Sequence, residues 1–260
     1  MFRNGDISEH EEVLKGWNSV VRIGNTIRRP ARPSSRTIQA LLRHLKAQEF
    51  AGAPEGLGFD EEGREMLSYV PGSAEHYPWR AFVYSEGNLY SVARLLRRYH
   101  DATISFSEPD DATWAVKIPG TAEVICHGDI GPYNTIYVRK EAVAFIDFES
   151  AAPGPRLWDV AFAVYRFARL CELSNIFAVS DAHLDRIAQR IRRFCDYYGF
   201  EERKSLLGTV LQRLEYQIAW ISALENVDIH RRAIVEEHLA FFRRDAIAIA
   251  RHVEKLGRYL

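Results

Sequence analysis

The sequence predicts an α+β protein in which a small antiparallel β-sheet precedes a larger, mostly helical region. Short apolar and β-branched runs separated by turn residues fill the first 70 residues, which is typical of strands. From residue 73 onward apolar residues recur mainly at helical spacing, with one strand-turn-strand stretch at 135–148. At 260 residues, 47% of them apolar, the chain can form one large domain or two modest lobes.

The N-terminal region predicts two pairs of strands on either side of one helix. Residues 20–23 and 26–29 flank a Gly-Asn turn, the signature of a tight hairpin, and a proline follows the second strand. The serine pair at 34–35 can cap the helix. Further short strands are expected at 56–59 and 65–70. The apolar stripe of the helix consists of Ile38, Leu41, Leu42 and Leu45.

The C-terminal region predicts a β-hairpin among helices. A short apolar run at 124–126 leads into a polar loop, and polar residues at 139–141 separate the apolar-rich runs 135–138 and 142–148. We therefore expect a hairpin to brace the loop that follows residue 126. The expected helices span residues 89–100, 159–173, 182–198, 202–224 and 230–256.

Composition excludes several classes of protein. The 34 basic and 35 acidic side chains give a formal net charge of -1, so no bulk charge attracts nucleic acid. No run approaches the roughly 18 apolar residues of a membrane span, and the N-terminus lacks an apolar signal core. We expect a cytoplasmic protein that binds neither nucleic acid nor membrane. Three cysteines are expected to be reduced and buried, without disulfide or zinc: Cys126, Cys171 and Cys195.

The most informative segment is a polar loop that begins His127-Gly128-Asp129, reaches Asn134, and is followed by Asp147 within Ile-Asp-Phe. These are the separations that phosphoryl-transfer sites use to orient a hydroxyl and hold Mg²⁺. Asp129 can orient an acceptor hydroxyl or take its proton, whereas Asn134 and Asp147 offer hard oxygens to the metal. A solvated loop without chemistry would need a chance match, expected in roughly one chain in several hundred. His127 is predicted to be a structural prop rather than a base.

A further acidic residue, Asp159, follows a Gly-Pro turn and precedes an apolar helical run. An aspartate in the first turn of a helix is explained equally well by the helix dipole alone. The eleven residues 148–158 leave no room for a long activation loop, and the sequence contains neither Asp-Phe-Gly nor Ala-Pro-Glu. A small-molecule acceptor is therefore favoured over a protein.

On His-Gly-Asp-x4-Asn, Ile-Asp-Phe and the downstream Gly and Asp159, the chain resembles the aminoglycoside phosphotransferase and choline kinase group of small-molecule kinases, relatives of the protein kinases. It looks most similar to the subgroup that includes trifolitoxin-immunity-type proteins. The resemblance implies a bilobal protein-kinase-like fold, with a nucleotide-binding lobe at 1–70, a hinge at 68–72, and a catalytic and acceptor-binding lobe at 73–260. It also implies that Asp159 braces the catalytic loop.

The nucleotide contacts implied by the resemblance depart from the family pattern. Ser68, Tyr69 and Val70 look like the hinge that meets the adenine, although a strand end before a turn is the alternative. The family places a lysine on the third strand and pairs it with a glutamate on the next helix, and this chain has neither in that form. Arg28 is the first candidate for the phosphate contact and Arg29 the second, with an exposed strand end as the alternative.

The implied cofactors are ATP, with GTP as an alternative, and Mg²⁺. The loop expected over the phosphates, residues 14–19, holds a single glycine, so transfer could be slow. We expect a phosphotransferase that moves the γ-phosphoryl group to a hydroxyl of a small molecule, such as an aminoglycoside or other antibiotic, choline or a sugar. The alternative is a kinase-fold binding or immunity protein that sequesters a toxin or ligand without turnover. Acceptor and oligomeric state stay open.

Overall fold

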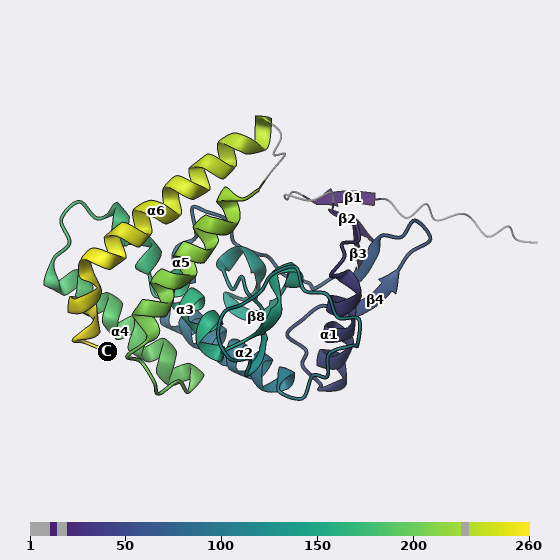
Figure 1. Ribbon diagram of the computed structural model, residues 1–260, viewed down its shortest axis with the longest axis horizontal. Coiled ribbons are helices and arrows are strands. Elements are labelled where there is room, and N and C mark those ends of the chain that lie inside the picture. Colours follow the sequence, from purple (N-terminus) through teal and green to yellow (C-terminus); the bar gives the residue numbers. More distant parts are fainter. Residues whose placement is uncertain (1–10, 15–19, 225–228) are drawn as a thin grey trace, which may run out of the picture.

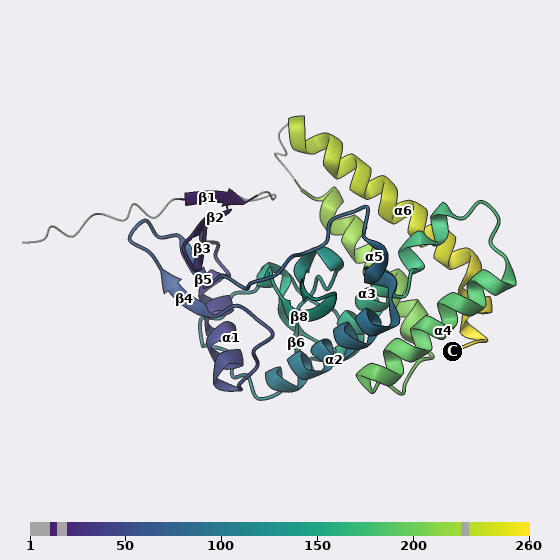
Figure 2. The ribbon, with the colours of Figure 1, turned by 180° about the vertical axis from the view of Figure 1, so that it is seen from behind.

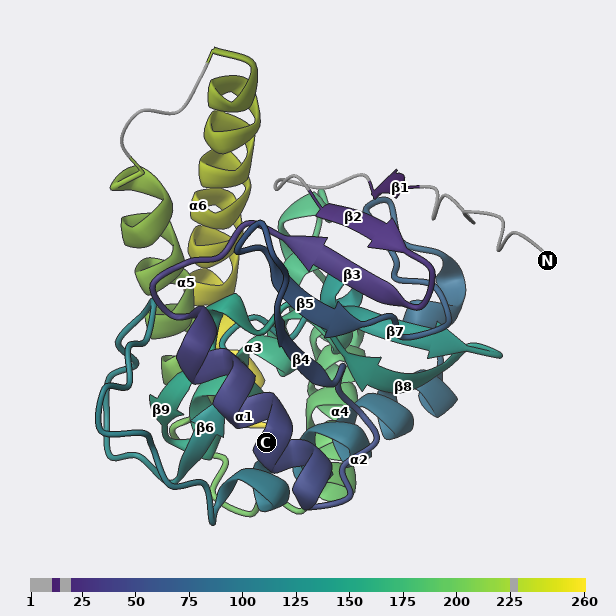
Figure 3. The same cartoon turned by 90° about the vertical axis from the view of Figure 1, so that its right-hand side faces the viewer.

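The computed structural model describes residues 11–14, 20–224 and 229–260. Its N-terminal part is a five-stranded antiparallel sheet with the spatial order β1-β2-β3-β5-β4 (Figure 3). The strands are β1 (Glu11–Leu14), β2 (Val20–Ile23), β3 (Thr26–Arg29), β4 (Gly56–Phe59) and β5 (Glu65–Ser68). The two expected pairs of strands are confirmed, and β1 adds an edge strand that the sequence did not predict.

Helix α1 (Ser35–Ala47) lies beside this sheet and contacts β4 (Figure 3). The four residues of its expected apolar stripe are at most 1% exposed, and burial of one such side chain contributes about 1.5–3 kcal/mol. The expected serine cap takes a different form. Ser34 forms no capping bond through its side chain, whereas the Ser35 hydroxyl accepts a 3.0 Å hydrogen bond from the backbone N–H of Arg32. The helix is thus held mainly by its apolar face.

The C-terminal part is mostly helical, and Figures 1 and 2 show α4, α5 and α6 at the end of the molecule opposite the sheet. The predicted helix at 159–173 is wrong in one respect. The helix ends at Phe167, Arg169 has a left-handed φ of 70°, and a 3₁₀ turn, η4 (Leu170–Asn175), follows. The long helices are α2 (Glu86–Thr103), α3 (Arg156–Phe167), α4 (Asp181–Tyr198), α5 (Leu206–Ser222) and α6 (Ile229–Gly257).

Two short β-ladders lie between the sheet and the helices. Strand β7 (Thr135–Val138) pairs with β8 (Glu141–Phe145), which confirms the expected hairpin, and β6 (Val124–Cys126) pairs with β9 (Ala152–Gly154). The second hairpin strand ends at Phe145 rather than at residue 148, because Asp147 has a φ of 63° that is incompatible with extended backbone. The remaining 3₁₀ turns are η1 (Ala81–Tyr84), η2 (Pro132–Asn134) and η3 (Phe148–Ser150).

Backbone contacts tie the sheet region to this hairpin. The N–H of Phe145 donates to the carbonyl of Gly52 at 2.9 Å, and Ser73 and Tyr137 exchange two backbone hydrogen bonds of 3.2 and 2.9 Å. Gly72 approaches so closely that a Cβ there would lie 2.8 Å from the carbonyl oxygen of Tyr137, and its φ is +137°. Glycine is therefore required where the chain crosses from the sheet to the hairpin.

A continuous apolar core joins both parts of the molecule. Tyr99 of α2 is fully buried, and its ring meets those of Phe50, Phe145 and Phe148 with centroids 5.7–6.5 Å apart. The three cysteines are buried free thiols. Within the described part of the chain, no helix is both long and apolar enough to cross a membrane.

Candidate active site

The polar loop 127–134 begins where β6 ends, and close packing fixes its backbone. Gly128 has a φ of +81°, and a Cβ at this position would lie 2.1 Å from the carbonyl oxygen of Ser150. An L side chain cannot be accommodated without moving the loop. The glycine therefore sets the path that delivers Asp129 to the surface.

The carboxylate of Asp129 is partly exposed and is held by two neighbours on its own loop. The hydroxyl of Tyr133 donates to Oδ1 at 2.7 Å, and Nδ2 of Asn134 donates to Oδ2 at 2.9 Å and to the backbone carbonyl of Asp129 at 3.1 Å. Burial, reinforced by the neighbouring Asp129, raises the pKa of Tyr133, so this phenol stays a proton donor. The carboxylate of Asp129 is thus held in one orientation at the surface of the loop.

Asn134 and Asp147 are brought together by the hairpin. The backbone N–H of Ile146, next to Asp147, donates to the carbonyl of Asn134 at 2.9 Å. The Nδ2 group of Asn134 is committed to Asp129, which leaves Oδ1 of the amide as a hard oxygen donor. The Asp147 side chain is 46% exposed. An amide oxygen and a carboxylate on adjoining segments suit Mg²⁺, which prefers hard oxygen ligands and keeps several waters.

The two candidate arginines of β3 point to opposite faces of the sheet, as adjacent strand residues must. Arg29 is the one beside the hairpin: its Nη1 lies 3.3 Å from Oδ1 of Asp147 and 3.2 Å from Oε1 of Glu149. Arg28 instead donates to the hydroxyl of Thr26 at 2.8 Å and lies 3.4 Å from Asp60. Strand alternation carries Arg28 away from Asp147, so the geometry favours Arg29 over Arg28 as the candidate for the phosphate contact.

Glu65 at the start of β5 supplies the acidic partner that the helix lacks. It faces Arg29 across the β3–β5 ladder and accepts from Nε of that arginine at 2.7 Å while being completely buried. Nε2 of Gln39 on α1 donates to its other oxygen at 3.1 Å. Burial alone would lower the pKa of Arg29, but Glu65, Asp147 and Glu149 raise it. Sequence reasoning missed Glu65, because only the strand register reveals its position opposite Arg29.

Asp159 of α3 contacts the backbone of the loop from behind. Its carboxylate accepts the backbone N–H groups of His127 at 2.6 Å and Gly128 at 2.9 Å, and Nε2 of His100 at 3.1 Å. Burial acts to raise the pKa of Asp159, but the hydrogen bonds from His100 and the loop lower it. Burial lowers the pKa of His100. A neutral His100 that donates from Nε2 can accept from Tyr198, whose hydroxyl lies 2.6 Å from Nδ1.

His127 acts as a prop within the loop. Its Nε2 lies 3.0 Å from the carbonyl of Ile146 and its Nδ1 accepts the backbone N–H of Asp129 at 3.3 Å, which defines the tautomer with the proton on Nε2. The ring is fully buried and lies 4.6 Å, between centroids, from that of Phe148. Both nitrogens are thus occupied by contacts with the backbone.

Arg213 of α5 is a second support that sequence reasoning missed. Its Nη2 donates to the carbonyl of Gly128, its Nη1 donates to Oε1 of Gln217 at 2.9 Å, and its guanidinium carbon lies 4.4 Å from the ring centre of Phe162. Burial lowers the pKa of Arg213. The available signal was its place on the apolar stripe, since Val210 and Leu214 at helical spacing are also buried.

The expected hinge residues follow β5 directly. The hydroxyl of Ser68 accepts the backbone N–H of Glu55 at 2.8 Å, and the N–H of Tyr69 donates to the carbonyl of Asn25 at 2.8 Å. Val70 has no backbone hydrogen bond to any residue in the described ranges. The loop expected over the phosphates lies outside the described residues, apart from its first member.

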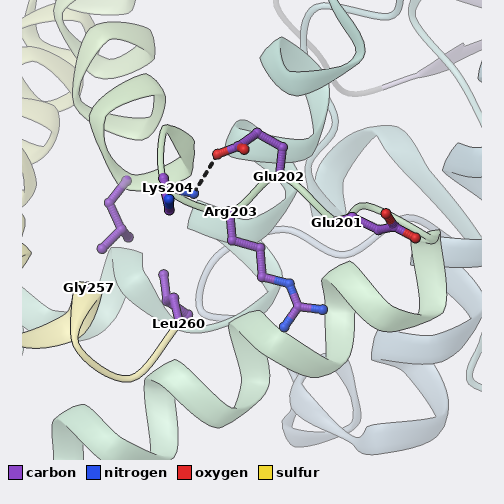
Figure 4. A pocket seen from close by; sticks show the side chains of 7 residues that line it. Glu201, Glu202, Arg203, Lys204, Gly257 and Leu260 are labelled. Carbon is purple, nitrogen blue, oxygen red and sulfur yellow. Dashed lines mark hydrogen bonds between the residues drawn. The ribbon is translucent and has the colours of Figure 1, made fainter.

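Two hollows of the surface lie away from the catalytic loop. One, of about 370 Å³, is bordered by Ser68, Tyr69 and Val70 and by the end of α1, but by neither Asp129 nor Asp147. The other, of about 420 Å³, lies near the C-terminus, where residues 201–204 face Gly257 and Leu260 (Figure 4). Neither hollow is lined by Asp129, Asn134 or Asp147.

Comparisons with known proteins agree with this geometry. Residues 110–189, which contain the loop, the hairpin and α3, match the model of a phosphotransferase enzyme family, APH. The trifolitoxin immunity protein of Rhizobium leguminosarum bv. trifolii is 35% identical over 196 residues, which cover 73% of each chain. The chain belongs to the APH phosphotransferase enzyme family.

Two solved structures have folds similar to that of this chain. A GDP complex of aminoglycoside 2'-phosphotransferase-IIIa has a TM-score of 0.61 at 14% identity, with 93% of this chain and 94% of that one covered. A choline kinase from Streptococcus pneumoniae has a TM-score of 0.60 at 14% identity, with 93% of both chains covered. At such identities the likeness concerns the fold, which confirms the protein-kinase-like α+β class.

Proposed function

We propose that the protein is a phosphotransferase that uses Mg²⁺ with ATP, or with GTP, and phosphorylates a hydroxyl group of a small molecule. The observation that carries this proposal is the direct contact of Asn134 with Asp129, together with the backbone hydrogen bond that holds Ile146, the residue before Asp147, against Asn134. Membership of the phosphotransferase family supports it. The GDP bound to one structural relative supports GTP as an alternative donor.

The roles of the residues follow from their contacts. Asp129, fixed through Tyr133 and Asn134, orients the acceptor hydroxyl and receives its proton on a carboxylate oxygen. Bound Mg²⁺ would neutralise charge on the transferred phosphoryl group, and Asn134 and Asp147 would hold it. Positioning and charge neutralisation dominate such transfers. Asp159 and Arg213 contribute by keeping the loop in place.

Arg29 is proposed as the phosphate contact in place of the usual lysine. Glu65 fixes one edge of its guanidinium, so Nη1 is directed to the carboxylates of the hairpin. A planar guanidinium held in this way can form two parallel hydrogen bonds with phosphate oxygens. Arg28 is not proposed for this role.

The lobe boundaries are proposed from the same contacts. The sheet with α1 forms the nucleotide-binding lobe at 1–70, residues 68–72 form the hinge, and 73–260 form the catalytic lobe. The backbone groups of Val70, which form no hydrogen bond to a described residue, support a hinge contact to a nucleotide base.

A second candidate function is binding without turnover. Two observations favour it: a relative at 35% identity is an immunity protein, and Arg29 occupies Asp147 and Glu149 with ion pairs. A sequestering protein would need neither Mg²⁺-nucleotide nor a general base. Asp129 and Asp147 therefore discriminate between the two functions.

The decisive experiment is mass spectrometry of pooled hydroxyl compounds incubated with the protein and Mg²⁺-ATP or Mg²⁺-GTP. Asp129→Asn keeps the shape of the side chain and should lower transfer about 10²–10⁴-fold, with nucleotide binding retained. Asp147→Asn should weaken Mg²⁺-dependent nucleotide binding. Asp181→Asn, on the surface of α4, is the matched control. Absence of both Mg²⁺-nucleotide binding and product would instead establish the sequestering function.

A further inference from the structure

Arg166 of α3 is a buried cation near Asp129, the proposed catalytic carboxylate. It has no hydrogen-bonded partner among the described residues. It is 5% exposed, and its Nε is buried without a hydrogen-bond partner. No described residue forms a hydrogen bond or an ion pair with its guanidinium. Buried charges are normally paired, so a cation left in this condition requires an explanation.

Aromatic rings surround this guanidinium and fix its position. The ring centres of Tyr165, Phe242 and Phe162 lie 4.8, 5.2 and 5.2 Å from its central carbon. The ring of Tyr133 lies at 5.5 Å, and the hydroxyl of that ring is bonded to Asp129. Trp79 and Phe241 complete the cage at 5.8 and 5.9 Å. One tyrosine ring therefore separates the caged cation from the proposed site of reaction.

The neighbouring charges do not satisfy Arg166. Asp245 is a buried carboxylate close to the cage, but its oxygens accept from the hydroxyls of Tyr165, at 2.6 Å, and Ser174. His238 of α6 has its pKa lowered by burial and then by Arg166. Arg244 lies over the ring of Phe241, 5.7 Å from its centre, next to the cage. The surroundings are thus mainly aromatic; Asp129 and Asp245 interact electrostatically with Arg166 but form no ion pair with it.

Arg213 offers a direct comparison within the same structure. It too is a buried arginine among aromatic rings, but it donates to the carbonyl of Gly128 and to Gln217, so its charge has a structural use. Arg166 makes no such bonds. The two arginines thus differ in that only Arg213 donates to described residues.

We infer that the acceptor is a hydroxyl compound that also carries a carboxylate, and that this carboxylate binds Arg166. A planar carboxylate can accept two parallel hydrogen bonds from a guanidinium. The ammonium group of an acceptor is disfavoured here, because Arg166 already fills the aromatic cage that could bind such a cation. The inference rests on the proposed phosphotransfer, because it names the class of acceptor for that reaction.

The test measures binding by ligand-detected NMR without nucleotide, so that it is independent of turnover. The probes are para-hydroxymethylbenzoate, its carboxamide and the corresponding benzylamine, together with glycerate, glyceramide and aminopropanediol. The proteins are the unmodified chain, Arg166→Met and Arg166→Lys. The control is Arg169→Met, three residues further along the chain, which alters a half-exposed side chain paired with Glu172.

We expect both carboxylates to bind the unmodified protein and Arg169→Met better than their amides and amines. Arg166→Met should bind them at least about tenfold more weakly. It should also remain folded, since apolar replacement of an unpaired buried cation is often neutral or stabilising. Arg166→Lys keeps the charge but not the two-pronged donor of the guanidinium, so it should retain a weakened preference for carboxylates. This variant tests the inference if Arg166→Met does not fold.

The inference is wrong if the amines bind better, if Arg166→Met binds the carboxylates unchanged, or if neither carboxylate binds up to its solubility limit. Phosphoryl transfer is then measured separately with Mg²⁺-ATP and Mg²⁺-GTP. Carboxylate binding without Mg²⁺-nucleotide binding would refute the proposed kinase and leave the anion site standing. Transfer to an amine in preference to a carboxylate would support the proposed kinase and refute the carboxylate site at Arg166.

Discussion

Removal of the Asp159 carboxylate distinguishes two possible structural roles of this residue, interaction with the helix dipole and support of the loop that begins at His127. As a residue of the first helical turn, it would interact only with the helix dipole, a contribution of about 0.3–1 kcal/mol. In the structure it is fully buried and accepts three hydrogen bonds, from the backbones of His127 and Gly128 and from His100. The two explanations predict very different losses of stability.

The expected loss follows from the groups left behind. Asp159→Ala leaves three buried donors without an acceptor, and each such donor costs about 1–3 kcal/mol. The sum is about 3–9 kcal/mol, and water that enters the space left by the carboxylate reduces it toward the lower end. Asp159→Asn keeps one oxygen but turns an NH₂ group toward a backbone donor, so we expect about 1–3 kcal/mol. Native proteins are stable by only about 5–15 kcal/mol, so the alanine variant should be near its threshold.

Urea unfolding at neutral pH measures these differences. Asp181→Ala is the matched control, because Asp181 lies in the first turn of α4 with its side chain 73% exposed and paired with Lys255. It should lose less than about 1 kcal/mol. A loss at Asp159→Ala no larger than that of the control would refute the brace and leave only the helix dipole. Phosphoryl transfer by the asparagine variant should fall even where the fold is retained.

Three further outcomes are expected. Arg29→Lys should weaken Mg²⁺-nucleotide binding whereas Arg28→Lys should not, because only Arg29 contacts Asp147; titration with a fluorescent nucleotide measures both. Gly128→Ala should destabilise by at least about 2 kcal/mol in urea unfolding, because of its left-handed φ and the close carbonyl. Burial lowers the pKa of His100 from 6.5, so the unfolded state takes up a proton more readily than the folded state. The free energy of unfolding should therefore fall as the pH drops below about 6.5. His100→Gln should reduce this dependence of stability on pH.

Each of these has a clear contrary result. Equal nucleotide affinity in the two arginine variants would remove Arg29 from the phosphate site. An alanine variant at Gly128 as stable as the unmodified protein would show that the loop can shift. An unchanged slope of stability against pH in His100→Gln would assign the acid sensitivity to other groups.

Local pattern identified most of the secondary structure, since strand and helix depend on neighbours close in the chain. The hairpin at 20–29, α1 and the hairpin at 135–145 were expected and are present. The helix beginning at Asp159 was expected to continue through residue 173, but Arg169 turns the backbone into the left-handed region. Such an ending has no strong local signal when glycine and proline are absent.

The choice between Arg28 and Arg29 illustrates what the strand pattern leaves undetermined. Alternation shows that the two side chains point to opposite faces, but the face that meets the catalytic loop depends on how the sheet docks. Pairing of β3 with β5 then places Glu65 opposite Arg29. The acidic partner thus comes from a strand rather than from the helix where it was sought.

By itself the sequence determined the class of fold, the family resemblance and the candidate site residues Asp129, Asn134 and Asp147, because these depend on residue types at short, fixed separations. Only the tertiary structure decided which arginine lies beside Asp147, which buried groups contact the loop, and that Arg166 lies among aromatic rings with no hydrogen-bonded partner among the described residues. Those facts depend on side chains that are far apart in the chain and meet only after the strands pair and the helices pack.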